Sequence, residues 1–164
     1  MLYLFDLDDT LISGYMDNPD KGYHKYRILP GRYEKLLDLR TRGDRICIAT
    51  NQAGVAHGFI TEEDVDFKMR FVLAQIGLFE AHTNSTRPIV YSCYYDTRGR
   101  PPWNDPIGAA RRKPSGAMLR EAMRDYPIDA ALGVLYVGDR PEDQAAAQDA
   151  GVAFQWAHIY FKDQ

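Results

Sequence analysis

The stretch that decides the fold lies at residues 2–10 and reads LYLFDLDDT, four apolar residues followed by a segment rich in aspartate. An apolar run that stops abruptly at charged residues is typical of a strand buried on both faces of a sheet. Four more runs of this kind occur along the chain. The pattern therefore predicts five buried strands, at residues 2–5, 45–49, 88–93, 133–137 and 152–156.

Helical patterns fill the segments between these runs. One amphipathic segment ends at Gly43, a residue type that often caps a helix C-terminus; another begins after Thr61, a favoured N-cap, and ends before Gly77. Pro114 and Pro141 are expected at the first position of two further helices. Because strands that alternate with helices imply parallel crossovers, the chain is predicted to be an α/β protein with a doubly wound, mostly parallel sheet.

The composition is that of one globular domain, expected over residues 1–164. The formal net charge of −3 disfavours a protein that coats nucleic acid, although a local basic patch stays compatible with it. Cys47 and Cys93 are too few for a disulfide framework and are expected in the core. With no membrane span or signal peptide evident, a cytoplasmic location is expected. Loop insertions rich in Gly, Pro and polar residues are expected near 13–28 and 94–112.

Polar side chains follow the expected strands at the points where they end. Asp6 and Asp8 come directly after the first strand, and Thr50 follows the second. Asp139 follows the fourth strand, and Lys113 stands just before an expected helix. Ligands of open α/β sheets bind outside the carboxyl ends of the strands. We therefore expect carboxylates, a hydroxyl group and a cation to converge at one edge of the sheet.

Carboxylates held this close need a counter-charge, since two of them about 4 Å apart repel by about 4 kcal/mol at an effective dielectric near 20. A set of oxygen ligands suits Mg²⁺, which keeps waters and takes further ligands from a substrate phosphate. Lys113 and Thr50 could hold the phosphoryl oxygens. Asp6 could attack phosphorus to form an aspartyl-phosphate, and Asp8 could protonate the leaving oxygen and later activate water.

Four ordered motifs resemble those of the haloacid dehalogenase-like (HAD) superfamily: FDLDDTL at residues 5–11, TNQ at 50–52, KP at 113–114 and VGDRPED at 137–143. The resemblance implies that Asp6 is the nucleophile and Asp8 the acid and base. It also implies that Thr50 and Lys113 hold the phosphate, and we assign Asn51 to substrate binding with them.

The resemblance further implies a Mg²⁺ site. Asp139 would bind the ion together with the Asp6 carboxylate and the backbone carbonyl of Asp8. Asp143, four residues after Asp139 and at the start of an expected helix, would support the metal directly or through water.

The stretch TNQAGVAHG at residues 50–58 is similar to the second motif of the branch that holds heptose bisphosphate, histidinol and polynucleotide 3′-phosphatases. Members of that branch lack a large cap domain. Only 39 residues separate Thr10 from Thr50, so no large cap is expected here. Some members carry a Cys/His zinc loop before the Lys-Pro motif. The corresponding residues 93–112 contain one Cys and no His, so a zinc site is not expected.

Two features leave alternatives open. Arg111 and Arg112 could be solvated charges or could read a second anionic group on the substrate, and we include Arg112 among the substrate-binding candidates. Residues 94–103 interleave aromatic side chains with arginines. Such a loop could stack on bases and follow a phosphate backbone, or it could simply pack against the body of the protein.

The sequence thus predicts a Mg²⁺-dependent phosphomonoesterase that acts through an aspartyl-phosphate on Asp6. Its substrate is either a sugar phosphate or a nucleic-acid 3′-phosphate end. The alternative is a non-enzymatic phospho-acceptor or binding module on the same fold. The order of the motifs disfavours a receiver module, because the acidic pair comes first and Asp139 follows Lys113.

Overall fold

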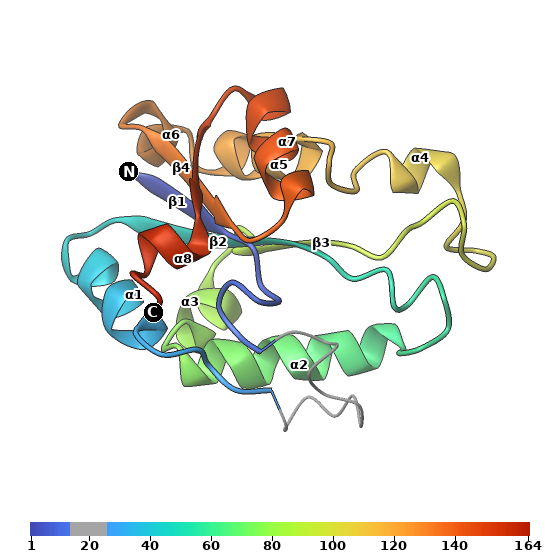
Figure 1. Cartoon of the computed structure of the whole chain (residues 1–164), viewed down its shortest axis with the longest axis horizontal. Coiled ribbons are helices and arrows are strands. Elements are labelled where there is room, and N and C mark those ends of the chain that lie inside the picture. Colours follow the sequence, from blue (N-terminus) through green and yellow to red (C-terminus); the bar gives the residue numbers. More distant parts are fainter. Residues whose placement is uncertain (14–25) are drawn as a thin grey trace.

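The computed structural model describes residues 1–13 and 26–164, and in them five strands form one parallel sheet with helices on both faces (Figure 1). The strands are β1 (Leu2–Phe5), β2 (Arg45–Asn51), β3 (Val90–Cys93), β4 (Val134–Gly138) and β5 (Ala153–Trp156). Their order across the sheet is β3-β2-β1-β4-β5. The chain winds outward from β1 to β3 and then returns to β4. The crevice between the ends of β1 and β4 is therefore the topological switch point, where ligands bind in such sheets.

The helices cover the two faces of the sheet, with α5 and α7 on one face and α2 and α3 on the other (Figure 1). In the described residues they are α1 (Arg32–Thr41), α2 (Glu62–Gln75), α3 (Phe79–Asn84), α4 (Pro106–Ala109), α5 (Ala117–Asp125), α6 (Pro127–Ala131), α7 (Pro141–Ala150) and α8 (Ala157–Tyr160). The short helices α3, α4, α6 and α8 were not predicted from the sequence. The α/β class and the five strands are confirmed.

Most of the predicted helix ends are confirmed. Thr61 and Asp64 form a reciprocal capping box at the start of α2, with N–O distances of 3.1 and 2.8 Å. Gly43 lies just beyond α1 with a φ of 81°, a left-handed conformation that glycine adopts without strain. Pro141 opens α7, which ends at Gly151.

The predicted helix start at Pro114 is wrong, because α5 begins three residues later at Ala117. The Asn51 side chain explains the difference. Its Oδ1 accepts a hydrogen bond from the Lys113 backbone N–H at 3.0 Å, and its Nδ2 donates to the Lys113 carbonyl at 3.2 Å. These two bonds hold the backbone before Pro114 in an irregular segment.

The predicted loops differ in how much the structure describes of them. Of the 13–28 insertion, residues 14–25 lie outside the described residues. The 94–112 insertion is a loop that the short helix α4 interrupts. The connections that the structure describes contain no cap domain.

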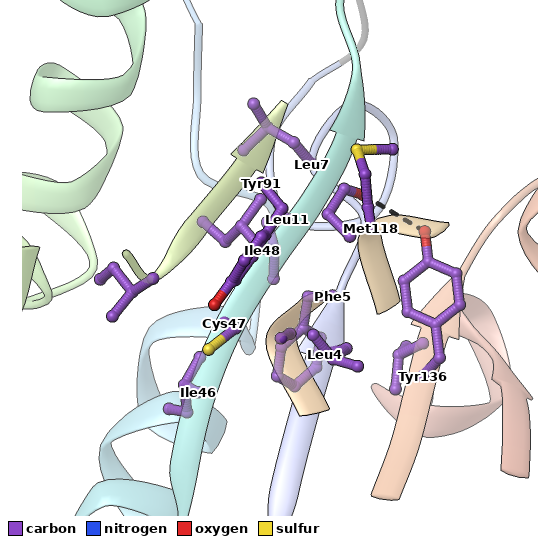
Figure 2. Packing of buried hydrophobic residues seen from close by; sticks show 14 of the residues in the cluster. Leu4, Phe5, Leu7, Leu11, Ile46, Cys47, Ile48, Tyr91, Met118 and Tyr136 are labelled. Carbon is purple, nitrogen blue, oxygen red and sulfur yellow. Dashed lines mark hydrogen bonds between the residues drawn. The ribbon is translucent and has the colours of Figure 1, made fainter. Parts of the chain in front are cut away.

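The core lies between the sheet and the helices on its two faces. Figure 2 shows Leu4 and Phe5 of β1 among side chains from the neighbouring strands and Met118 of α5. Cys47 and Cys93 are buried and free of disulfides, as the sequence predicts. Among the residues described, no helix has the length and apolar character needed to cross a membrane.

A buried arginine ties the loop after β1 to residues near the C-terminus. Arg32 is only 2% exposed, and its Nε donates to the Thr10 carbonyl at 2.9 Å. Its two terminal nitrogens donate to the two carboxylate oxygens of Asp163, and one also donates to the Pro30 carbonyl. The guanidinium group lies 4.2 Å from the centre of the Phe161 ring. This contact therefore fixes the loop that carries the first motif.

Replacing Asp163 by asparagine is expected to lower the free energy of unfolding by about 1–3 kcal/mol at pH 7, because buried Arg32 loses its anionic partner. Hydrogen bonds from Arg32 hold the pKa of Asp163 below its ordinary value of 3.8. The contribution is therefore present above pH 3.8 and is lost as the pH falls through the lowered pKa. Urea unfolding at pH 7 and pH 3 measures the difference, which should be smaller at pH 3.

The matched control is Asp66→Asn on α2. Asp66 pairs with Arg70 across one helical turn, where the two side chains are 55% and 60% exposed. Its replacement should change the free energy of unfolding by less than about 0.5 kcal/mol. Equal losses for the two variants at pH 7 would contradict the role assigned to Asp163.

Candidate active site

Three carboxylates meet at the crevice between β1 and β4. Asp6 follows β1, Asp139 follows β4, and Asp143 lies in the first turn of α7. Each offers an oxygen, and these oxygens all lie within 4.8 Å of one another. Gly138 makes this approach possible, because a Cβ there would lie 2.5 Å from the Cβ of Asp143. The sequence prediction that these acids converge is therefore supported by their positions.

The backbone at the start of α7 holds Asp143 in place. Its Oδ2 accepts hydrogen bonds from the backbone N–H groups of Asp139, at 3.1 Å, and Arg140, at 3.0 Å. Its Oδ1 accepts from Lys113 and from the Tyr136 hydroxyl group. Both oxygens of Asp143 are thus already engaged within the protein.

Lys113 supplies the positive charge of the site. It is 4% exposed, and its Nζ lies 2.6 Å from Asp6 Oδ1 and 2.5 Å from Asp143 Oδ1. The same nitrogen lies 3.2 Å from the Ala49 carbonyl and 2.9 Å from the Tyr136 hydroxyl group. Burial by itself lowers the pKa of Lys113, but the two carboxylates outweigh it and raise the pKa above its ordinary value. Lys113 therefore stays charged.

One lysine does not neutralise three carboxylates. Burial, together with the neighbouring Asp143 carboxylate, raises the pKa of Asp6 to about 8, although Lys113 opposes the shift. Burial and the Asp143 carboxylate also raise the pKa of Asp139. A divalent cation would remove this excess of negative charge, and a cluster of carboxylate oxygens is the donor set that Mg²⁺ takes in proteins. The residues present therefore fit Mg²⁺.

Asp8 lies beside this cluster and is held from two sides. Its Oδ2 accepts a hydrogen bond from Gln52 Nε2 at 2.9 Å, and its Oδ1 lies 2.8 Å from Lys68 Nζ. The same Gln52 nitrogen also donates to Thr50 Oγ1 at 2.9 Å. Thr50 is buried at the end of β2. Gln52 thus connects Asp8 with the predicted phosphate-binding hydroxyl group.

A cavity of about 410 Å³ opens over these side chains. It brings together most of the residues that the sequence analysis assigned to the site, and its lining includes Asp6, Asp8, Asn51, Arg112, Lys113 and Asp143. Thr50 and Asp139 are each hydrogen-bonded to a residue that lines it, Thr50 to Gln52 and Asp139 to Asp143. Both ends of the Asn51 amide bind the Lys113 backbone, and the substrate-binding role of Asn51 stays a prediction.

The two adjacent arginines point to different places. Arg111 donates to both carboxylate oxygens of Glu121 and to the Ser92 carbonyl, and it does not line the cavity. Arg112 lines the cavity, with Nη2 at 3.9 Å from Asp96. Its Nη1 is buried and has no hydrogen-bond partner within the described ranges. Of the two candidates for reading a second anionic group, only Arg112 faces the site.

The loop rich in aromatic residues and arginines packs on itself and against the core. Tyr94 and Tyr95 contact the Trp103 ring edge-on, with ring centres 5.7 and 5.1 Å apart. Buried Asp96 accepts hydrogen bonds from the backbone and side chain of Arg98 and lies 3.2 Å from His57 Nε2. The Arg98 hydrogen bonds hold the pKa of Asp96 well below its usual range. These contacts agree with packing against the protein body rather than with a base-stacking surface.

Sequence reasoning missed Lys68, Tyr136 and Asp96. For Lys68 a signal was present, because it shares the buried face of α2 with Val65 and Val72, a position where a lysine is unexpected. Tyr136 lies inside an apolar strand and gives no sign that its hydroxyl group reaches Lys113.

The chain is similar in sequence to a family of known phosphatases. The profile of the family described as Polynucleotide kinase 3 phosphatase matches residues 1–161. A D-glycero-beta-D-manno-heptose-1,7-bisphosphate 7-phosphatase of Haemophilus ducreyi is 30% identical, with 90% of this chain and 76% of that protein covered. Its counterpart in Rhodopseudomonas palustris is 27% identical, with 89% and 78% covered.

A solved structure extends the likeness to three dimensions. The D,D-heptose 1,7-bisphosphate phosphatase of B. bronchiseptica, complexed with magnesium and phosphate, is 29% identical. It superposes with a TM-score of 0.69 over 93% of this chain and 78% of that one. The likeness supports magnesium as the metal of this chain, for which the acidic cluster offers a suitable donor set.

Magnesium binding can be measured without any substrate. Mg²⁺ at about 100 times its dissociation constant is expected to raise the free energy of unfolding by about 2.7 kcal/mol, because the ion binds only the folded carboxylate cluster. Asp139→Asn removes one of the clustered carboxylates and should weaken this response. Thermal unfolding across a Mg²⁺ titration provides the measurement.

Glu142→Gln is the control for charge alone. Glu142 lies next to Asp143 in the first turn of α7 but is exposed and outside the cluster. This variant should keep the response of the unmodified protein. If Asp139→Asn also kept it, the place of Asp139 in the metal site would be disproved.

Proposed function

The chain belongs to the Polynucleotide kinase 3 phosphatase family, and from that premise we propose that it hydrolyses a small phosphorylated sugar through an aspartyl-phosphate on Asp6. It is a Mg²⁺-dependent HAD-like phosphomonoesterase. The observation that carries the proposal is the position of Asp6 at the switch point, in contact with Lys113 and beside the other acids. The cytoplasmic location stays a prediction.

In the first half-reaction, an Asp6 carboxylate oxygen attacks phosphorus while the bond between phosphorus and the ester oxygen breaks. The ester oxygen keeps the bonding electron pair and takes a proton from Asp8, and the alcohol leaves. Asp6 then carries the phosphoryl group as an acyl-phosphate. Lys113 and Thr50 hold the phosphoryl oxygens during this transfer.

In the second half-reaction, water attacks phosphorus and gives a proton to the Asp8 carboxylate. The bond between phosphorus and the Asp6 oxygen breaks, the electron pair returns to Asp6, and inorganic phosphate leaves. Asp8 is protonated again and Asp6 is again a carboxylate, so the cycle closes. The proximity of Asp8 to Thr50, through Gln52, supports its access to the reacting groups.

The metal would be held by the Asp6 and Asp139 carboxylates and by the Asp8 backbone carbonyl. When bound, Mg²⁺ neutralises negative charge, so that an anionic phosphate can approach an anionic nucleophile. Both oxygens of Asp143 already accept hydrogen bonds from the protein. This supports a contact between Asp143 and the metal through water.

Two observations favour a small sugar substrate with a second anionic group. Relatives of about 30% identity are heptose-1,7-bisphosphate 7-phosphatases, and the buried Nη1 of Arg112 has no partner within the described residues. The packing of Tyr94 and Tyr95 on Trp103 also leaves the loop less suited to stack on bases. A nucleic-acid 3′-phosphate is the second candidate, since the family is described by that activity.

Asp6→Asn is expected to lower phosphate release from p-nitrophenyl phosphate by roughly 10⁴-fold or more, because the amide cannot form the acyl-phosphate. Circular dichroism should show a folded protein. Asp9→Asn changes a neighbouring aspartate that has no assigned role in the reaction, and it should retain most of the activity. Turnover by Asp6→Asn near that of the Asp9 variant would exclude Asp6 as the nucleophile.

Arg112→Met is expected to lower kcat/KM for a sugar bisphosphate by about 10–100-fold, since it removes a charged contact to the second phosphate. The loss should be small with p-nitrophenyl phosphate, which has no second anion. Arg111→Met is the matched control and should show no such selectivity, because Arg111 pairs with Glu121 outside the cavity.

The same assay includes a 3′-phosphorylated oligonucleotide. A kcat/KM for this substrate well above those for all sugar phosphates would overturn the choice of substrate class and leave the catalytic residues unaffected.

A further inference from the structure

Lys68 is a buried cation that the proposed reaction does not use. It lies in the middle of α2 and is 3% exposed. Its Nζ is 2.8 Å from Asp8 Oδ1 and 4.4 Å from the centre of the Tyr26 ring. Lysine is almost never buried unless its charge is paired, because removing an ammonium group from water is costly. The charge of Lys68 is therefore stabilised by its pairing with Asp8.

Each carboxylate oxygen of Asp8 has a partner from another side chain. Lys68 reaches Oδ1 from α2, and Gln52 reaches Oδ2 from the segment after β2. Two contacts from different elements fix the rotation of a carboxylate in a way that one contact does not. A group that first gives a proton to the leaving oxygen and then takes one from water must keep its orientation through both steps.

We propose that Lys68 is a positioning residue that holds Asp8 in its catalytic orientation. The proposal rests on the proposed function, in which Asp8 is the acid and base. Lys68 touches no substrate in this scheme and acts only through the Asp8 carboxylate. It lines the same cavity as Asp8 and Gln52, so the three side chains form one wall of the site.

The position of Lys68 on α2 argues against a purely structural salt bridge. Its neighbours on the same helical face, Val65, Met69 and Val72, are apolar and buried. An apolar residue at position 68 would continue that face without a desolvation penalty. A second ion pair on this helix, between Arg70 and Asp66, lies in solvent, where such pairs contribute little. Lys68 departs from this apolar pattern, and its side chain contacts Asp8.

The test compares two leaving groups. p-Nitrophenolate leaves without a proton, whereas the alkoxide of a sugar or alkyl phosphate needs one from Asp8. Lys68→Met should lower kcat/KM for an alkyl phosphate by about 10–100-fold, a part of the roughly 10²–10⁴-fold that general acid catalysis contributes. It should lower kcat/KM for p-nitrophenyl phosphate by less than about threefold. Formation of the acyl-phosphate governs kcat/KM in both cases.

Arg70→Met is the matched control, since it removes a cation from the same helix where that cation is exposed. It should leave kcat/KM unchanged for both substrates. Lys68→Met in an Asp8→Asn background should add no further loss on the alkyl phosphate, because the two residues act as one unit. Circular dichroism melting establishes that each variant is folded. If Lys68→Met does not fold, Lys68→Gln keeps a donor without the charge and should show the same selectivity to a smaller degree.

The outcomes separate the two levels of the hypothesis. If Asp8→Asn loses activity selectively on the alkyl phosphate, the positioning role of Lys68 would be overturned by either of two results for Lys68→Met. These results are an equal loss of kcat/KM on both substrates and no loss on either. Full activity of Asp8→Asn on the alkyl phosphate would instead overturn the acid and base role of Asp8, and with it the proposed function.

Discussion

The Lys113 ammonium group, buried between the Asp6 and Asp143 carboxylates, is the contact on which the arrangement of the site depends. Its Nζ also meets the Ala49 carbonyl of β2 and the Tyr136 hydroxyl group of β4, which Figure 2 shows in the core. One side chain thus joins both neighbours of β1 to the start of α7. Removing either partner of a buried ion pair leaves an uncompensated charge, so the loss of any one of these contacts would destabilise the site.

Much of the fold follows from short-range patterns that the sequence carries openly. Each of the five apolar runs forms a strand, because short, nearly continuous apolar runs are typical of strands buried on both faces of a parallel sheet. Thr61 and Gly43 mark helix ends through local backbone chemistry. The convergence of Asp6 and Asp139 could also be predicted, because parallel strands bring their carboxyl ends to one edge.

What could not be predicted depends on contacts between residues far apart in the chain. The helix α5 begins at Ala117 rather than at Pro114, because Asn51 binds the backbone of Lys113, 62 residues further along the chain. Arg111 and Arg112 are adjacent and chemically identical, so only the three-dimensional structure separates the one paired with Glu121 from the one that faces the cavity. The contacts of Asp8 with Gln52 and Lys68 likewise join residues far apart in the chain.

Gly138 has a consequence for how this enzyme can evolve. Any other amino acid at this position would bring a Cβ to 2.5 Å from the Cβ of Asp143, so a substitution there has to displace Asp143 or the backbone that carries it. Position 138 therefore tolerates little variation, since the acidic cluster depends on the place of Asp143. Arg112 lines the same cavity without touching Asp6, so a change of substrate preference can arise there while the nucleophile keeps its place.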